Sequence, residues 1–88
     1  DGRIRFRFHA RDVNLVLRPR EGDVPFRVFV DGESPGDAHG LDVDEAGHGT
    51  LVQPRLYQLI RHPGSITDRT FEIAFDAAGV EAYAFTFG

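Results

Sequence analysis

Hydrophobic residues recur at every second position in several short segments of this 88-residue chain. In the first of these segments, Ile4, Phe6 and Phe8 alternate with arginines. Successive side chains of a β-strand point to opposite faces, so this alternation predicts strands with one buried face. No segment has the 3.6-residue period of an amphipathic helix. The predicted strands span residues 4–8, 13–18, 25–31, 50–53, 55–61, 70–75 and 80–87.

The segment 55–61 fits two patterns. Leu56 and Ile60 are four residues apart, as on a helix, whereas Tyr57 and Leu59 share one face of a strand. We favour a strand with a bulge, because no neighbouring segment has a helical pattern.

Residues 31–49 are the least regular part of the chain. They are rich in glycine and in acidic side chains. We predict a long loop here with one short strand at residues 41–43, and a loop of this length in so small a domain is usually functional or mobile.

Seven or eight short strands separated by turn residues predict an all-β fold, an antiparallel β-sandwich. The chain has eight phenylalanines, and each one that is buried contributes about 1.5–3 kcal/mol. Two sheets can therefore close on each other without a disulfide. The residues predicted to face the core are Ile4, Phe6, Phe8, Val13, Leu15, Leu17, Phe26, Val28, Val30, Phe71, Ile73, Phe75, Tyr83, Phe85 and Phe87.

Composition narrows the class of protein. Hydrophobic residues make up 41% of the chain and charged residues 27%, as in an ordinary globular domain, and the length predicts a single domain over residues 1–88. The net charge of −4 argues against a nucleic-acid partner, since nucleic-acid binders are usually basic. The absence of cysteine excludes disulfides, thiolate metal sites and thiol chemistry within this segment. No apolar run approaches the roughly 20 residues of a membrane helix.

The ends of the sequence suggest its place in a longer protein. It starts at Asp1 and contains no methionine, and the last predicted strand runs up to Gly88. We expect it to be the C-terminal part of a longer chain.

Small and apolar residues also occupy outward positions of the predicted strands. They include Val16, Phe29 and Ala82, together with Ala74 and Ala84. Such residues either form a docking surface or lie beneath loops that fold back over the sheet.

Acidic and imidazole side chains in the irregular segment are candidate metal ligands. Asp42 and Asp44 are two residues apart and Glu45 follows, which suits a hard cation such as calcium. His39 and His48 would favour zinc instead. Neither spacing matches a known tight metal loop, and a solvated acidic loop is the favoured interpretation.

Catalytic chemistry has weaker support. On a strand, Asp42 and Asp44 would face the same way about 7 Å apart, but many acidic sequences contain such pairs. Ser34 and Ser65 lie in no nucleophile motif, and there is no phosphate-binding loop. We predict that this domain by itself is not an enzyme.

Arginines alternate with the apolar residues of the first strand. Arg3, Arg5 and Arg7 can bind carboxylates or phosphates, or they can mark a charged edge strand that resists edge-to-edge association. We favour the edge strand, with pairing to the acidic loop as an additional role.

Several segments taken together resemble a known family. They are FHARDVNLVL (8–17), PFRVFVDG (25–32), HGLDVD (39–44), RLYQLI (55–60) and GVEAYAFTFG (79–88). On these segments the chain is similar to the C-terminal domain of DipZ-type proteins, which are redoxin-family thiol–disulfide proteins linked to cytochrome c biogenesis. The resemblance covers nearly the whole chain and is most specific in RLYQLI and AYAFTFG.

The resemblance implies a jelly-roll sandwich like that of carbohydrate-binding modules. It also implies a thioredoxin-like domain in the same parent chain, which carries the reactive cysteines, and a location outside the cytoplasmic membrane. The parent would then be a thiol–disulfide oxidoreductase. No catalytic residue transfers to this segment, because it has no Cys-x-x-Cys motif.

Two roles for such an accessory domain stay open. One is polysaccharide binding, with Tyr57, Arg55, Asp42 and Asp44 near the site; Tyr57 is either exposed there or part of the core.

The other role is docking. The domain would contact the thioredoxin-like partner, or a second copy in a homodimer, through the face that includes Val16, Phe29 and Ala82. No cofactor is expected, and calcium held by Asp42 and Asp44 is the alternative that stays open.

Overall fold

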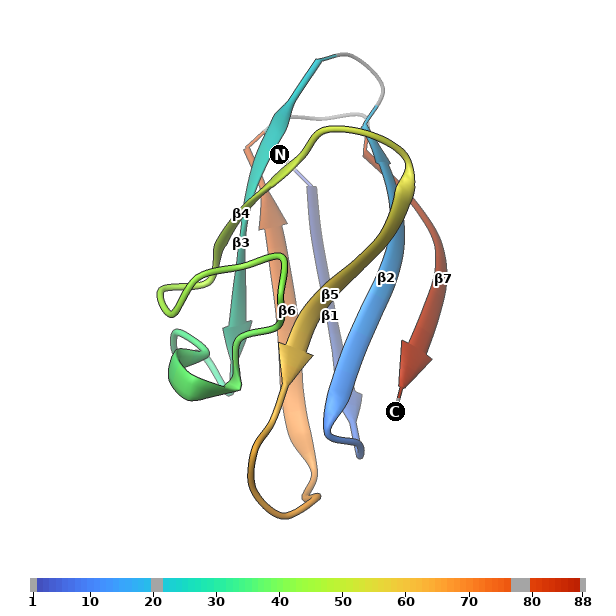
Figure 1. The fold of residues 1–88 in the computed structure, drawn as a ribbon. Helices are drawn as coiled ribbons and strands as arrows, with labels where there is room; N and C mark the ends of the chain where they lie inside the picture. Colours follow the sequence, from blue (N-terminus) through green and yellow to red (C-terminus); the bar gives the residue numbers. More distant parts are fainter. Residues whose placement is uncertain (1, 20–21, 77–79, 88) are drawn as a thin grey trace.

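The computed structural model shows two antiparallel sheets packed face to face (Figure 1). It describes residues 2–19 and 22–76, and residues 80–87 for the backbone. A single turn of 3-10 helix, η1 (Gly36–Ala38), lies in the long loop. The strands are β1 (Gly2–Phe8), β2 (Asp12–Pro19), β3 (Val24–Val30), β4 (His48–Leu51), β5 (Arg55–Arg61), β6 (Arg69–Phe75) and β7 (Val80–Phe87).

The strands divide into a four-stranded sheet, ordered β1-β6-β3-β4, and a three-stranded sheet, ordered β5-β2-β7. Every pairing between these strands is antiparallel. The predicted β-sandwich of about seven strands is therefore confirmed. Among the described residues, no helix is long and apolar enough to cross a membrane.

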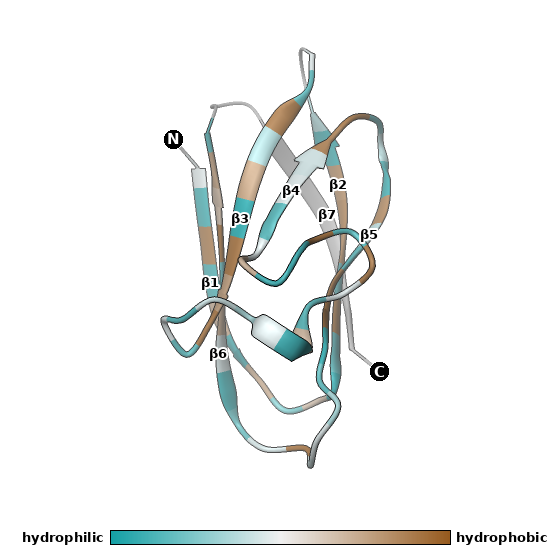
Figure 2. Cartoon of the chain, turned by 60° about the vertical axis from the view of Figure 1, so that its left-hand side comes forward, coloured by the Kyte–Doolittle hydropathy of each residue, from teal (hydrophilic) through white to brown (hydrophobic). Residues whose placement is uncertain are grey.

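The core lies between the two sheets and follows the predicted alternation. Figure 2 shows bands of hydrophobic and hydrophilic residues along β1 and β3. Of the predicted core residues, Ile4 and Phe6 are only partly buried, and the side chains of Tyr83, Phe85 and Phe87 lie outside the described residues. The remaining predicted positions are buried, and so are Val24, Leu51, Tyr57, Leu59 and Ile60.

The predicted bulge in the fifth segment is confirmed. Val13 pairs with Ile60 and Asn14 pairs with Gln58, so Leu59 is the extra residue on β5. The bulge lets both Leu59 and Ile60 point into the core, where their exposed fractions are 0% and 1%.

Two predictions for the segment between β3 and β5 are wrong. Residues 41–43 form a turn instead of a strand, because the Asp42 N–H donates to the Gln58 carbonyl and the Val43 N–H donates back to Gly40. The next strand is β4 (His48–Leu51) instead of 50–53. It begins earlier because the β3 pairing already includes Arg27 opposite His48.

Candidate functional site

The loop after η1 lies along the outer edge of β5. The Gly40 N–H donates to the Leu59 carbonyl at 2.9 Å and the Asp42 N–H donates to the Gln58 carbonyl at 3.1 Å. In return, the Gln58 N–H donates to the Asp42 carboxylate at 2.7 Å. A Cβ atom at Gly40 would lie 2.3 Å from the Gln58 carbonyl oxygen, so this close approach requires glycine. The loop therefore covers the strand edge.

Asp42 also binds Arg55 through two hydrogen bonds. Arg55 Nη2 donates to Asp42 Oδ1 at 2.7 Å and Nη1 donates to Oδ2 at 3.2 Å. Burial raises the pKa of Asp42, but the hydrogen bonds from Arg55 and Gln58 and the arginine charge together hold that pKa below its ordinary value. Asp42 is therefore ionised at neutral pH, and its oxygens are used within the fold.

Tyr57 belongs to the core. Its side chain is 0% exposed, and its ring meets Phe26 edge to face at a centroid distance of 6.3 Å. The Tyr57 hydroxyl donates to the Gln53 carbonyl at 2.7 Å and accepts the Val52 N–H at 3.1 Å. The Arg55 guanidinium stacks 3.8 Å from the ring centroid. Of the two placements that the sequence left open for Tyr57, the structure shows the core one, and the ring offers no open face to a sugar.

The structure therefore brings together three of the four predicted ligand-binding residues, Arg55, Asp42 and Tyr57. We call these three residues the β5 brace, because each contacts another or holds the loop against β5. Their contacts hold the loop against this edge, whereas their role toward a ligand stays a prediction.

The fourth predicted residue, Asp44, points elsewhere. Its Oδ1 accepts the His48 N–H at 2.9 Å, and this hydrogen bond is the main reason why the pKa of Asp44 lies below its ordinary value. The prediction that Asp42 and Asp44 share a strand face is wrong, because their segment is a turn. Among residues 2–19 and 22–76, whose side chains the structure describes, no group of three His, Asp or Glu side chains is arranged to hold a metal ion.

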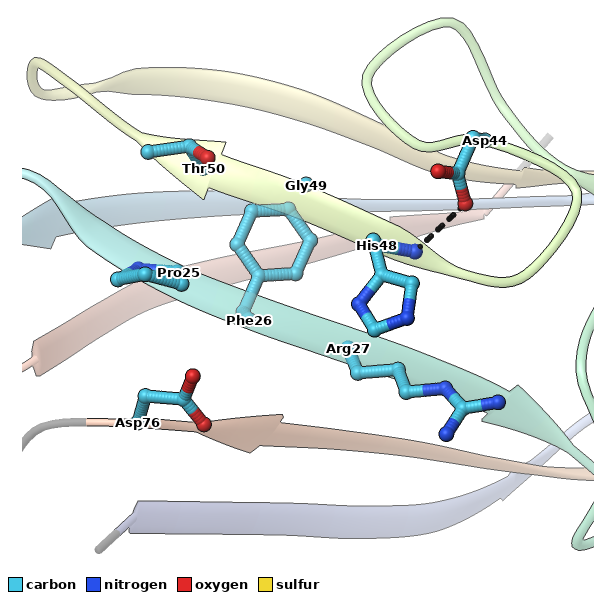
Figure 3. Close-up of a pocket in the computed structure, with 8 residues that line it drawn as sticks. All are labelled: Pro25, Phe26, Arg27, Asp44, His48, Gly49, Thr50 and Asp76. Atoms are coloured by element: carbon cyan, nitrogen blue, oxygen red, sulfur yellow. Dashed lines mark hydrogen bonds between the residues drawn. The ribbon is translucent and has the colours of Figure 1, made fainter.

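Asp44 lines a hollow on the outer face of the four-stranded sheet (Figure 3). The volume of the hollow is about 450 Å³. Cross-strand pairing brings Arg27 opposite His48 and Pro25 opposite Thr50, and the Asp76 N–H donates to the Pro25 carbonyl at 3.0 Å. The lining residues are Pro25, Phe26, Arg27, Asp44, His48, Gly49, Thr50 and Asp76.

Most residues of this hollow have no functional signal in the sequence. The pattern singles out Asp44 and His48 as metal ligands, but it does not connect Arg27, Thr50 and Asp76 to them. Alternation does place Arg27 on the outward face of its strand. Only the register between β3 and β4 brings it beside His48, and no local signal in the sequence encodes that register.

The predicted docking face is not one surface. Val16 is on β2 in the three-stranded sheet, whereas Phe29 is on β3 in the four-stranded sheet. Both are outward positions between buried neighbours, so they lie on opposite sides of the sandwich. The third residue, Ala82, is paired through its Cα with Leu17, and its side chain lies outside the described residues.

On the three-stranded sheet, Val16 has an apolar neighbour. Its Cα partner on β5 is Leu56, which is 42% exposed, and its Cα partner on β7 is Ala84. Val16 itself is half-buried. Phe29, on the other sheet, is covered in part by the Arg27 guanidinium 4.9 Å from its ring centroid. The apolar outer surface therefore includes Val16 and Leu56 but not Phe29.

Comparison with known families gives a match over the whole chain. A family model described as the thioredoxin-like C-terminal domain matches residues 1–88. No curated protein and no solved structure matches the chain.

Proposed function

The chain belongs to the family of thioredoxin-like C-terminal domains, and from this premise we propose that it is a non-catalytic domain that docks onto the thioredoxin-like domain of its parent protein. The chain has no cysteine, so it has no thiol chemistry of its own. The thioredoxin-like domain would carry out the redox reaction, and the present domain would position that thioredoxin-like domain.

The main support for this proposal is a pair of apolar side chains on the outer face of the three-stranded sheet. Val16 and Leu56 are cross-strand partners, and Leu56 is 42% exposed. Interfaces between domains of one chain bury apolar residues of this kind within a more polar surround. The opposite sheet presents arginines on its outer face, which makes it the less suitable side for an apolar contact.

We also propose that the parent is a DipZ-type thiol–disulfide oxidoreductase located outside the cytoplasmic membrane. The support is the resemblance of the segments 55–60 and 79–88. A cysteine pair in a thioredoxin-like segment preceding residue 1 in the parent gene is the expected finding.

The docking proposal is tested by mixing isotope-labelled domain with the separately expressed thioredoxin-like domain of the parent. We expect NMR shift changes at Val16 and Leu56, and a loss of affinity of about tenfold for Leu56→Asp. Ile66→Asp is the matched control, since Ile66 is a similarly exposed aliphatic residue (49%) outside the strands. Absence of binding, or an equal loss in both variants, would contradict docking through this sheet.

Polysaccharide binding is the second candidate, and the hollow of Figure 3 favours it. Thr50, His48 and Asp76 are exposed there and supply both donors and acceptors for sugar hydroxyls. The hollow lies on the four-stranded sheet, whereas Arg55 and Tyr57 of the β5 brace lie on the three-stranded sheet, so substitutions in the hollow test it separately from the brace. A glycan array followed by calorimetry at millimolar sugar should show binding that Thr50→Val and Asp76→Asn weaken; no binding to any glycan would remove this candidate.

A further inference from the structure

The outer edge of β1 is open. In the four-stranded sheet β1 is the terminal strand and pairs with β6 alone; Figure 2 shows it at the margin of the molecule. Along the part of the chain that the structure describes, no loop hydrogen-bonds to this edge as residues 39–42 do to β5. An open strand edge presents unpaired N–H and C=O groups, which are a template for another strand.

The outward side of β1 is strongly basic. Arg3 and Arg5 are 66% and 70% exposed, and both approach one carboxylate, Glu72, at 3.0 and 3.9 Å. The Arg7 guanidinium donates instead to a neutral hydroxyl, that of Thr70, at 3.3 Å. The predicted edge strand is thus confirmed, but its arginines contact β6 and not the acidic loop. A second carboxylate is also close, because Asp31 lines one hollow together with Arg5, Thr70 and Glu72. Three cations beside two anions leave one positive charge in surplus.

The inward side of β1 is incompletely covered. Ile4 and Phe6 are half-buried, whereas their cross-strand partners Ile73 and Phe71 are 0% exposed. The partners are sealed because β6 has a neighbouring strand on each side. One more strand beside β1 would cover the exposed parts of Ile4 and Phe6 in the same way.

We propose that β1 accepts an added strand from another polypeptide, in which acidic and apolar residues alternate. Its main chain hydrogen-bonds to the open edge, as in other cases of strand addition. Its acidic side chains lie beside Arg3, Arg5 and Arg7, where opposite charges on adjacent strands attract. Its apolar side chains cover Ile4 and Phe6. This site is on the other sheet from Val16 and Leu56, so it is independent of the proposed docking.

The same features argue against two other occupants. A second copy of this chain pairing β1 with β1 would place arginines beside arginines, which repel. A polyphosphate or nucleic-acid strand would bind the arginine charges. It would not pair with the backbone donors and acceptors of β1, and it would not cover Phe6. Charge complementarity and the half-buried apolar pair together select an acidic, alternating peptide.

The proposal is tested with a nine-residue peptide alternating Glu and Val, capped at both ends, added to the isotope-labelled domain. Two control peptides alternate Lys and Val, or contain the same Glu and Val residues in two blocks. We expect NMR shift changes over residues 2–8 with the alternating acidic peptide and weaker or no binding of the controls.

Charge-reversal variants make the test specific. Arg7→Glu should weaken binding of the acidic peptide about fivefold and strengthen binding of the Lys peptide. Arg61→Glu, an exposed arginine at the end of β5, is the control and should change neither. If Arg7→Glu lowers the unfolding midpoint of the domain, Arg3→Glu replaces it in the binding test. No binding at millimolar peptide, equal binding of the block peptide, or equal competition by polyphosphate would overturn the proposal.

Discussion

The edges of β5 and β1 are protected from pairing with other chains in different ways. Both strands end a sheet, and an uncovered strand edge tends to pair with other chains. At β5 the loop 39–42 occupies the edge with backbone and carboxylate hydrogen bonds. At β1 the protection is charge, carried by arginines that are largely exposed. The covered edge has its backbone groups hydrogen-bonded within the domain, whereas the charged edge can still pair with a partner of opposite charge.

Glycine substitutions at the two edges should differ most in their effect on the free energy of unfolding. We predict that Gly40→Ala lowers the free energy of unfolding by about 3 kcal/mol, because its Cβ would meet the Gln58 backbone at 2.3 Å. Gly2→Ala, on β1, should change it by less than about 0.5 kcal/mol, since the nearest atom is a Phe75 ring carbon at 3.4 Å. Urea unfolding measures both; equal effects would contradict the asymmetry.

The carboxylate of the covered edge should have the next largest effect. Asp42→Asn keeps the shape but removes the charge that binds Arg55 and Gln58. We expect a loss of about 1.5 kcal/mol, measured by urea unfolding at pH 7. Asp37→Asn, in the exposed part of the same loop, serves as control and should cost little.

The same residue predicts a pH dependence. Because the pKa of Asp42 is lower in the folded state, its contribution is complete above the pKa of the unfolded chain, about 4, and is lost as the pH falls through the folded value. The difference in stability between wild type and Asp42→Asn should therefore shrink below about pH 4. A constant difference down to pH 2 would show that the carboxylate charge does not brace β5.

Ion pairs on the open edge should matter less. Glu72→Gln removes the carboxylate that Arg3 and Arg5 share. Since these arginines are largely exposed, we expect a change of about 0.5 kcal/mol or less in urea unfolding. A loss of unfolding free energy as large as that of Asp42→Asn would mean that the β1 arginines stabilise the fold and are not available to a partner.

Calcium should have the smallest effect. The Asp42 oxygens already accept hydrogen bonds from Arg55 and Gln58, and Asp44 is bonded to the His48 backbone. We expect the melting temperature to be unchanged by millimolar calcium or by chelator. A calcium-dependent rise that Asp44→Asn abolishes would restore the metal site that the sequence suggested.

Period-two alternation is sufficient to predict the sandwich. Strands such as β2 and β6 bury every second residue, and this local pattern is a direct consequence of the pleat. It also places Arg3, Arg5 and Arg7 correctly on an outward face. The fold class therefore needs no long-range information.

Alternation cannot assign a strand to a sheet. Val16 and Phe29 are both outward, yet they lie on opposite sides of the molecule, because only the strand order decides which sheet each belongs to. The turn at residues 41–43 escapes prediction for a similar reason. The alternation of Leu41 and Val43 with Asp42 resembles a strand, but hydrogen bonds to the distant β5 fix it as a turn.

Residue-resolved amide hydrogen exchange on the domain tests the difference between the two edges most directly. Alternate N–H groups of an antiparallel edge strand point away from its neighbour. We predict rapid exchange at every second amide of β1, and slow exchange at Gly40, Asp42 and Gln58, whose N–H groups join the loop to β5. Uniformly slow exchange along β1, or rapid exchange at those three amides, would contradict the account.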